Sequence, residues 1–205
     1  MTENIEFVKH NSIKIVGSKI VYIDPYKVDE NYNDADYIFC THSHYDHFSP
    51  EDIIKIKKET TKIITVKSSE DDAKKLVNTV MIVEPNKEYS IDEIKFKTTF
   101  AYNENKQFHP KENNWVGFII TLDGIDYFIA GDTDNVPEIR DVKCDVALLP
   151  VGGTYTMTLE EAADLANVID AKVVLPTHYG VIVGSLDDGE KFAELVKNKN
   201  VEIKN

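Results

Sequence analysis

One short stretch constrains the fold of this chain more than any other: Thr41-His42-Ser43-His44-Tyr45-Asp46-His47. It holds three of the six histidines of the chain and a carboxylate, in the pattern His-x-His-x-Asp-His. Residues 37–40 before it predict a buried strand, and Ser49-Pro50-Glu51-Asp52 after it predicts a helix start. A strand-to-helix turn lets successive side chains aim at one point, whereas on a strand they alternate between faces. The stretch therefore predicts a metal site, and the alternative is a polar loop that happens to be rich in histidine.

Length and charge limit the classes of protein to consider. A chain of 205 residues predicts a single domain, residues 1–205, with its own core. The net charge is −13, and Arg140 is the single arginine. No basic stripe and no arginine cluster is present in the sequence, which disfavours an extended nucleic-acid surface. Whatever anion the protein handles must be held mostly by something other than basic side chains, and a pair of bound divalent metal ions meets that need.

Compartment signals favour the cytoplasm. No apolar run approaches the roughly 20 residues that a membrane span needs. Residues 1–6 have neither a basic nor an apolar segment, so we expect no signal peptide. Cys40 and Cys144 each lie in a predicted buried strand, which favours burial over a disulfide and suits a reducing compartment.

The sequence as a whole predicts many strands with a few helices between them. Strands are predicted over residues 5–8, 13–16, 20–23, 37–40, 62–66, 80–83, 88–91, 94–100, 116–122, 125–130, 146–149, 173–175 and 201–203. Helices are predicted after Ser49, with Ile53, Ile54 and Ile56 as the candidates to face inward, and over residues 69–77, 158–169 and 187–196. Asp123-Gly124 predicts a two-residue hairpin turn.

Every histidine lies at or just after a predicted strand end, and two aspartates join them to form a ligand set. A zinc ion takes about four ligands, so two ions that share a carboxylate and a water need roughly seven from the protein. The candidates are His42, His44, Asp46, His47, His109, Asp132 and His178. Asp134 is an alternative to Asp132, and a surface histidine beside Pro110 is the alternative for His109.

These motifs together resemble the metallo-β-lactamase superfamily over essentially the whole chain. The turn is followed by Gly131-Asp132-Thr133 and by Pro176-Thr177-His178-Tyr179-Gly180. The lactonase-like branch, which includes the L-ascorbate-phosphate lactonases, is resembled through His10, Asp24-Pro25 and Pro150-Val151-Gly152-Gly153-Thr154-Tyr155-Thr156-Met157. The resemblance implies an α/β (α+β) fold, a four-layer αββα sandwich with the site at one edge.

The resemblance also implies a role for each ligand. The first metal ion would be held by His42, His44 and His109, and the second by Asp46, His47 and His178, with Asp132 bridging. Asp46 would orient the nucleophile, and Asp24 would brace a turn or a ligand histidine.

Four further residues are candidates for the substrate pocket. The resemblance implies that His10 contacts substrate and assists catalysis, the alternative being a core histidine. Asn103, Lys111 and Tyr155 lie in predicted loops and are expected to bind substrate, with a structural or solvated role as the alternative.

The chemistry that follows is hydrolysis. Two divalent ions, two carboxylates and a hydroxide leave a local charge of about +1, which favours a small anionic substrate. Metal binding lowers the pKa of water toward about 7, so a metal-bridging hydroxide is expected to cleave a lactone or phosphoester bond. Zinc or manganese is expected, with iron and nickel as alternatives. The alternative functions are a metal-dependent nuclease or phosphodiesterase acting on nucleic acid, a non-catalytic metal-binding protein and a di-iron redox enzyme. Whether the chain forms a homo-oligomer is left open.

Overall fold

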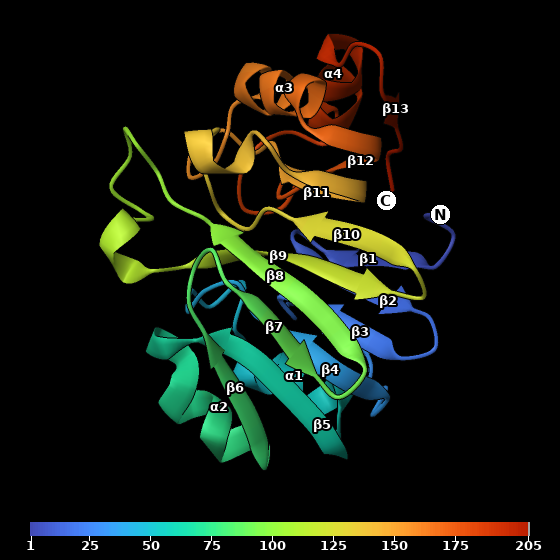
Figure 1. Cartoon of the computed structure of the whole chain (residues 1–205), viewed down its shortest axis with the longest axis vertical. Coiled ribbons are helices and arrows are strands. Elements are labelled where there is room, and N and C mark those ends of the chain that lie inside the picture. The colour runs from blue at the N-terminus through green and yellow to red at the C-terminus, as the bar shows by residue number, and fades with distance from the viewer. Residues whose placement is uncertain (205) are drawn as a thin grey trace. The chain divides into compact units, whose positions relative to one another are not determined.

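A computed structural model describes residues 1–204, which form two compact units (Figure 1). The N-terminal unit comprises residues 2–84, and the C-terminal unit comprises the residues from Pro85 onward together with Met1. Each unit contains one β-sheet and its own helices. The prediction of a single domain over residues 1–205 stays a prediction.

The N-terminal unit is built on a six-stranded sheet in simple sequence order, from β1 to β6. Its strands are β1 (Ile5–Lys9), β2 (Ser12–Val16), β3 (Ile20–Ile23), β4 (Ala35–Phe39), β5 (Lys57–Val66) and β6 (Thr79–Val83). The first three are antiparallel, whereas β3 to β6 run parallel. Parallel strands need crossover connections: residues 24–34, without a helix, join β3 to β4, the helix α1 (Pro50–Ile56) joins β4 to β5, and the helix α2 (Glu70–Leu76) lies between β5 and β6.

The helix α1 (Pro50–Ile56) begins as its sequence predicts, because the Ser49 hydroxyl accepts a bond from the Asp52 N–H at 3.3 Å. Ile53 is fully buried, as expected, but Ile54 is 54% exposed, so the prediction that it faces inward is wrong. Successive helical residues point about 100° apart, and the buried face continues at Ile56, which is fully buried as expected.

The core of this unit lies where α1 and α2 (Glu70–Leu76) meet the sheet. Ile38 and Ile63 from the strands pack with Ile53, Ile56 and Ala73 from the helices. Cys40, immediately before the histidine-rich turn, belongs to the same core.

The C-terminal unit is built on a seven-stranded sheet in the order β13-β12-β11-β10-β9-β8-β7. Its strands are β7 (Glu88–Ile91), β8 (Ile94–Phe100), β9 (Val116–Leu122), β10 (Ile125–Ile129), β11 (Lys143–Pro150), β12 (Asp170–Thr177) and β13 (Asn200–Val201). The strands β7 to β10 are antiparallel, and β10 to β13 are parallel. The turn between β9 and β10 has positive φ at Asp123 (53°) and Gly124 (78°), as the predicted two-residue hairpin requires.

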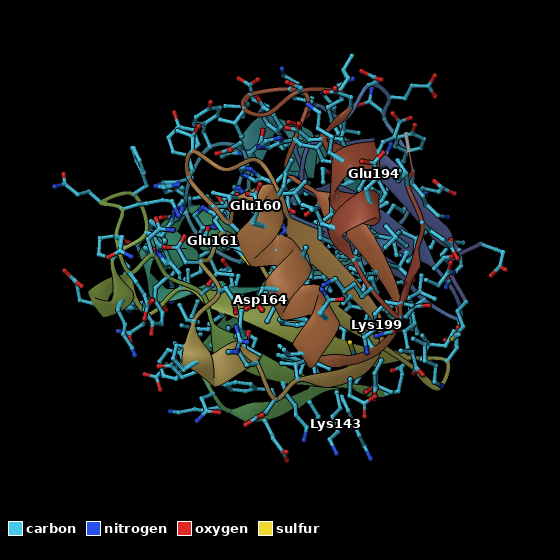
Figure 2. The ribbon with its side chains drawn as sticks, turned by 90° about the horizontal axis from the view of Figure 1, so that it is seen from above. Lys143, Glu160, Glu161, Asp164, Glu194 and Lys199 are labelled. Atoms are coloured by element: carbon cyan, nitrogen blue, oxygen red, sulfur yellow. The ribbon has the colours of Figure 1, made fainter. Side chains whose placement is uncertain are left out.

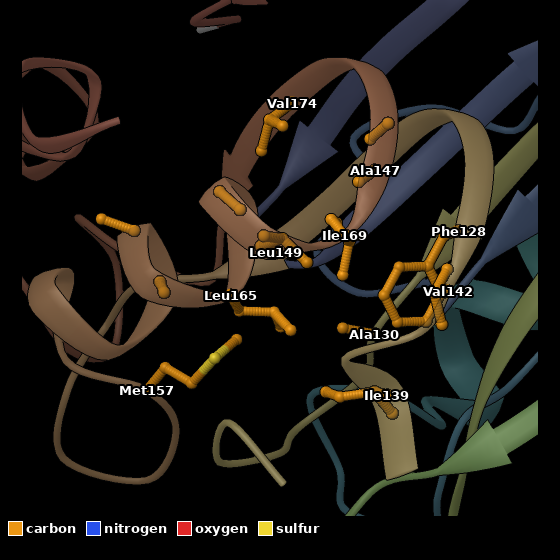
Figure 3. Close-up of a cluster of buried hydrophobic side chains, with 14 of the residues drawn as sticks. Phe128, Ala130, Ile139, Val142, Ala147, Leu149, Met157, Leu165, Ile169 and Val174 are labelled. Carbon is orange, nitrogen blue, oxygen red and sulfur yellow. The ribbon is translucent and has the colours of Figure 1, made fainter. Parts of the chain in front are cut away.

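The helices α3 (Leu159–Val168) and α4 (Asp188–Leu195) pack against the parallel part of this sheet. A capping box starts α3: the Glu161 N–H donates to Thr158 Oγ1 at 3.2 Å, and the Thr158 N–H donates to Glu161 Oε2 at 2.9 Å. Figure 3 shows the core beneath it, where Leu165 points toward Leu149 and Ile139. Charged residues such as Glu160 are exposed on α3 (Figure 2). The amphipathic helix predicted at this position is confirmed.

Cys40 and Cys144 are both buried and both free thiols, as expected. Burial raises the pKa of the Cys144 thiol to about 12, with nearby Asp145 adding to the shift. Within residues 1–204, every helix is too short or too polar to cross a bilayer.

Candidate metal centre

The histidine-rich turn of the N-terminal unit gathers its imidazoles into a small volume. Directly after β4 the chain reverses, with the N–H groups of His47 and Phe48 both donating to the His44 carbonyl. His42 Nε2 lies 3.1 Å from His44 Nδ1, and the ring centroids of His42 and His47 are 4.0 Å apart. The convergence predicted for this turn is therefore present within the unit.

Asp24 holds the turn in its orientation through hydrogen bonds to Thr41 and His47. Its carboxylate, fully buried, accepts bonds from Asn11 Nδ2 (2.8 Å) and from the Thr41 N–H and hydroxyl (2.7 and 2.8 Å). It also lies 2.8 Å from His47 Nδ1, so Nδ1 carries the proton and Nε2 is the candidate ligand nitrogen. Asp24 thus holds both the turn and His47, and the role of His47 as a metal ligand stays a prediction.

The two candidate catalytic residues are neighbours in this unit. Asp46 Oδ2 lies 3.6 Å from His47 Nε2 and 3.6 Å from His10 Nε2. His10 is buried in the turn after β1, with its φ at 60°, and the edge of its ring meets Tyr26. Its place beside Asp46 agrees with a role near the reacting groups, and that role stays a prediction.

A second cluster lies in the C-terminal unit around Asp132. Asp132 Oδ2 lies 3.2 Å from His109 Nε2 and 3.0 Å from His178 Nε2, and all three residues are buried. Asp132 follows β10 through Gly131 (φ 68°), and His178 follows β12 with its own φ at 60°. Of the two aspartates that the sequence offers here, Asp132 is the one beside the histidines.

Asp134 reaches the histidines only through another residue, Asn103. Its carboxylate accepts a bond from Asn103 Nδ2 at 3.0 Å, and Asn103 Oδ1 in turn lies 3.0 Å from His109 Nδ1. Asn103, predicted to bind substrate, is thus in contact with a candidate ligand. Nothing in the local sequence signals this contact, because Asn103 and Asp134 are separated by 31 positions in the chain.

The other two predicted pocket residues make contacts within the C-terminal unit. Lys111 Nζ lies 2.6 Å from Glu138 Oε1, which raises the pKa of Lys111, and it stands over the Tyr102 ring at 4.4 Å. The Tyr155 ring meets Phe108 edge-on, with the centroids 4.6 Å apart. Their predicted roles toward substrate stay predictions.

Both clusters have the donor chemistry and spacing of metal ligands. Around a four-coordinate ion with ligands 2.0–2.1 Å away, neighbouring ligand atoms lie about 3.3 Å apart. The separations of 3.0–3.2 Å between His42 and His44, and between Asp132 and its two histidines, are close to that value. Imidazole nitrogen with carboxylate oxygen suits zinc and manganese among other divalent ions. The residues present therefore fit a divalent metal.

Comparisons with known proteins point the same way. A sequence model of the β-lactamase superfamily domain matches residues 4–178. A metal-dependent hydrolase from Thermococcus onnurineus is 32% identical over 214 residues, covering 95% of this chain and 92% of that protein. The crystal structure of a candidate metal-dependent hydrolase from Parabacteroides distasonis matches with a TM-score of 0.85 and 32% identity, covering 98% and 91%. A metallo hydrolase from Ignicoccus hospitalis, at 21% identity and a TM-score of 0.74, covers 98% and 94% and shows similarity of fold alone.

Proposed function

The chain belongs to the metallo-β-lactamase superfamily and is a metal-dependent hydrolase, and from this premise we propose that it uses two divalent ions to cleave a lactone or phosphoester bond in a small anionic substrate. The family resemblance and the α/β fold class expected from the sequence are confirmed, while the lactonase-like branch stays a prediction. The observation that carries the proposal is the donor set. It comprises His42, His44, Asp46, His47, His109, Asp132 and His178, the number and type of ligands that two ions sharing a carboxylate require.

Asp46 and Asp132 of this set, together with His10 beside it, have distinct tasks in the proposed reaction. Bound divalent ions supply a water of lowered pKa, near 7, and stabilise negative charge that develops on the substrate. Asp46, the carboxylate of the turn, orients the attacking water and accepts its proton. His10, with Nε2 at 3.6 Å from Asp46, stabilises the leaving group or the developing oxyanion. Asp132, with two carboxylate oxygens, would help to hold the ions together with His109 and His178.

Charge supports a small anion as substrate. The protein carries a net charge of −13, and its single arginine, Arg140, is bonded to Asp164 at 2.7 Å. A polymer of phosphates would meet repulsion over most of such a surface, whereas a small anion meets only the local field of the metal centre. Zinc and manganese are the ions proposed.

The test is hydrolysis by the metal-loaded protein. Metal-free protein is loaded with Zn²⁺ or Mn²⁺, its metal content per chain is measured, and panels of lactones and aryl phosphodiesters are assayed. Two ions per chain are expected, and His44→Ala and Asp132→Ala should lower the rate at least 100-fold. The control is Glu160→Ala, on the exposed face of α3. Hydrolysis undiminished in both ligand variants would overturn the proposal, and RNA cleavage without small-molecule turnover would favour a nuclease.

We further propose that the protein works in the cytoplasm. Cys40 and Cys144 are both unbridged, which suits a reducing compartment. Fractionation of cells that express the protein tests this, and recovery outside the cytoplasmic fraction contradicts it.

A further inference from the structure

Asp134 ties two ligand-bearing segments of the C-terminal unit together. It lies two residues after Asp132 and is only 6% exposed. One of its oxygens accepts bonds from Asn103 Nδ2 (3.0 Å) and Lys106 Nζ (2.5 Å), and the other accepts from the Glu104 N–H (3.0 Å). Its own N–H donates to the Tyr102 carbonyl at 2.9 Å. The turn after β10 is therefore bonded at several points to the start of the loop that leads to His109.

Asn103 is hydrogen-bonded to His109 at the other end of that loop. The Asn103 N–H donates to the His109 carbonyl at 2.8 Å, and Asn103 Oδ1 accepts from the His109 N–H at 3.1 Å. The same oxygen lies 3.0 Å from His109 Nδ1. Three contacts between two residues thus hold both the backbone and the ring of the histidine.

The hydrogen-bond pattern decides which way the Asn103 amide faces. Its Nδ2 lies 3.0 Å from two acceptors, Asp134 Oδ1 and the Tyr155 carbonyl, and its Oδ1 faces the His109 N–H. A flipped amide would set carbonyl against acceptors and NH₂ against a donor. An amide oxygen only accepts, so His109 Nδ1 carries the proton, and Nε2 faces Asp132 Oδ2 at 3.2 Å.

We propose that Asn103 and Asp134 are positioning residues for the metal centre, with Asp134 orienting the Asn103 amide and Asn103 holding His109 in the Nδ1–H form with Nε2 as the ligand atom. The inference rests on the proposed function in taking His109 as a ligand. It gives Asn103 a task different from substrate binding. Asn103 is 6% exposed, and both ends of its amide are bonded inside the protein.

Groups that orient ligand histidines in this way change metal affinity about 10- to 100-fold when removed. Asn103→Asp keeps an acceptor for His109 but sets two carboxylates face to face, so the Zn²⁺ dissociation constant should rise by about that factor. The exchange variant Asn103→Asp/Asp134→Asn restores a donor opposite an acceptor, and it should recover most of the lost affinity. Gln107→Ala, in the same loop and exposed, is the matched control.

The experiment measures Zn²⁺ affinity of the full chain by chelator competition, the absorption spectrum of the Co²⁺-loaded form, and the unfolding temperature of the metal-free form. The expected result is weaker Zn²⁺ binding and an altered Co²⁺ spectrum for Asn103→Asp, recovery in the exchange variant and no change for Gln107→Ala. Wild-type affinity in Asn103→Asp, or an exchange variant no better than the single one, would overturn the inference.

A second measurement uses the wild-type protein, so it does not depend on whether a variant folds. Long-range ¹H–¹⁵N correlation spectra of the Zn²⁺-loaded wild type report which nitrogen of His109 is protonated. Protonated Nδ1 supports the inference, and protonated Nε2 overturns it. The variant His109→Ala distinguishes an error in the proposed ligand set from an error in the proposed role of Asn103. If it binds two Zn²⁺ as tightly as wild type, the proposed ligand set is wrong. If it loses metal while Asn103→Asp does not, only the positioning role is wrong.

Discussion

Removal of the Asp24 carboxylate should destabilise the N-terminal unit more than any surface change. Asp24→Ala deletes the acceptor of bonds from Asn11, His47 and both donors of Thr41, all of them buried. A hydrogen bond to a charged group contributes about 1.5–3 kcal/mol, but losses within one network do not add. Loss of one partner from a buried charged network costs about 3–5 kcal/mol. For a chain of this size that corresponds to a fall of about 6–20 °C in unfolding temperature.

Calorimetry of the metal-free protein measures this fall, and hydrogen exchange of the β4 amides locates it. Asp24→Asn keeps the shape and one acceptor, so its loss should be the smaller of the two. Asp29→Ala, an exposed aspartate of the same unit, should lie within about 0.5 kcal/mol of wild type. A loss below about 1 kcal/mol for Asp24→Ala would refute the idea that Asp24 supports the turn.

Three further expectations concern metal, core and pH. Zn²⁺ at 100 times its dissociation constant should add about 2.7 kcal/mol to the free energy of unfolding, and a chelator should reverse this gain. An unfolding temperature that is the same with and without Zn²⁺ would contradict a site that exists only in the folded protein. Leu165→Ala, in the core beneath α3, should cost about 2–5 kcal/mol in urea denaturation, whereas Val168→Ala, 46% exposed on the same helix, should cost little; equal costs would count against the packing described. The Lys172 ammonium, followed by the Asp126 N–H, lowers the pKa of Asp145, so this carboxylate stabilises the protein above about pH 4 and stops doing so as the pH falls through its lowered pKa. The stability difference between wild type and Asp145→Asn should therefore shrink in acid, and a difference constant from pH 7 to pH 2 would be evidence against it.

The histidine-rich turn was predictable because its signals are local. A buried strand, a Ser49 cap and a Pro50 start follow one another within a few residues, and each acts through neighbours in the chain. The error at Ile54 is of the same local kind, since three nearby isoleucines allow two choices of helix face and only packing decides between them. The strand β5 begins at Lys57, five residues before the expected start at 62, because its first residues are polar and still pair with the sheet.

The role of Asn103 was not predictable in this way. Its partners Asp134 and Tyr155 lie 31 and 52 positions further along the chain, and hydrogen bonds of that range leave no spacing pattern in a sequence. The family motifs point to His109 and Asp132 as candidate ligands, but not to the residues that contact them. A sequence shows the donors of a metal site more readily than the amides and carboxylates that hold them in place.

The positive φ angles at His10, Asp24 and His178 affect how deletion experiments on this enzyme should be designed. A side chain in the left-handed region costs about 1–2 kcal/mol, and alanine bears that cost as fully as histidine does. Glycine removes both the functional group and the strain. His178→Gly should therefore yield an inactive protein more robust to heat than His178→Ala. At His178 the left-handed backbone lowers the folding stability of the chain, and glycine at this position would relieve the strain.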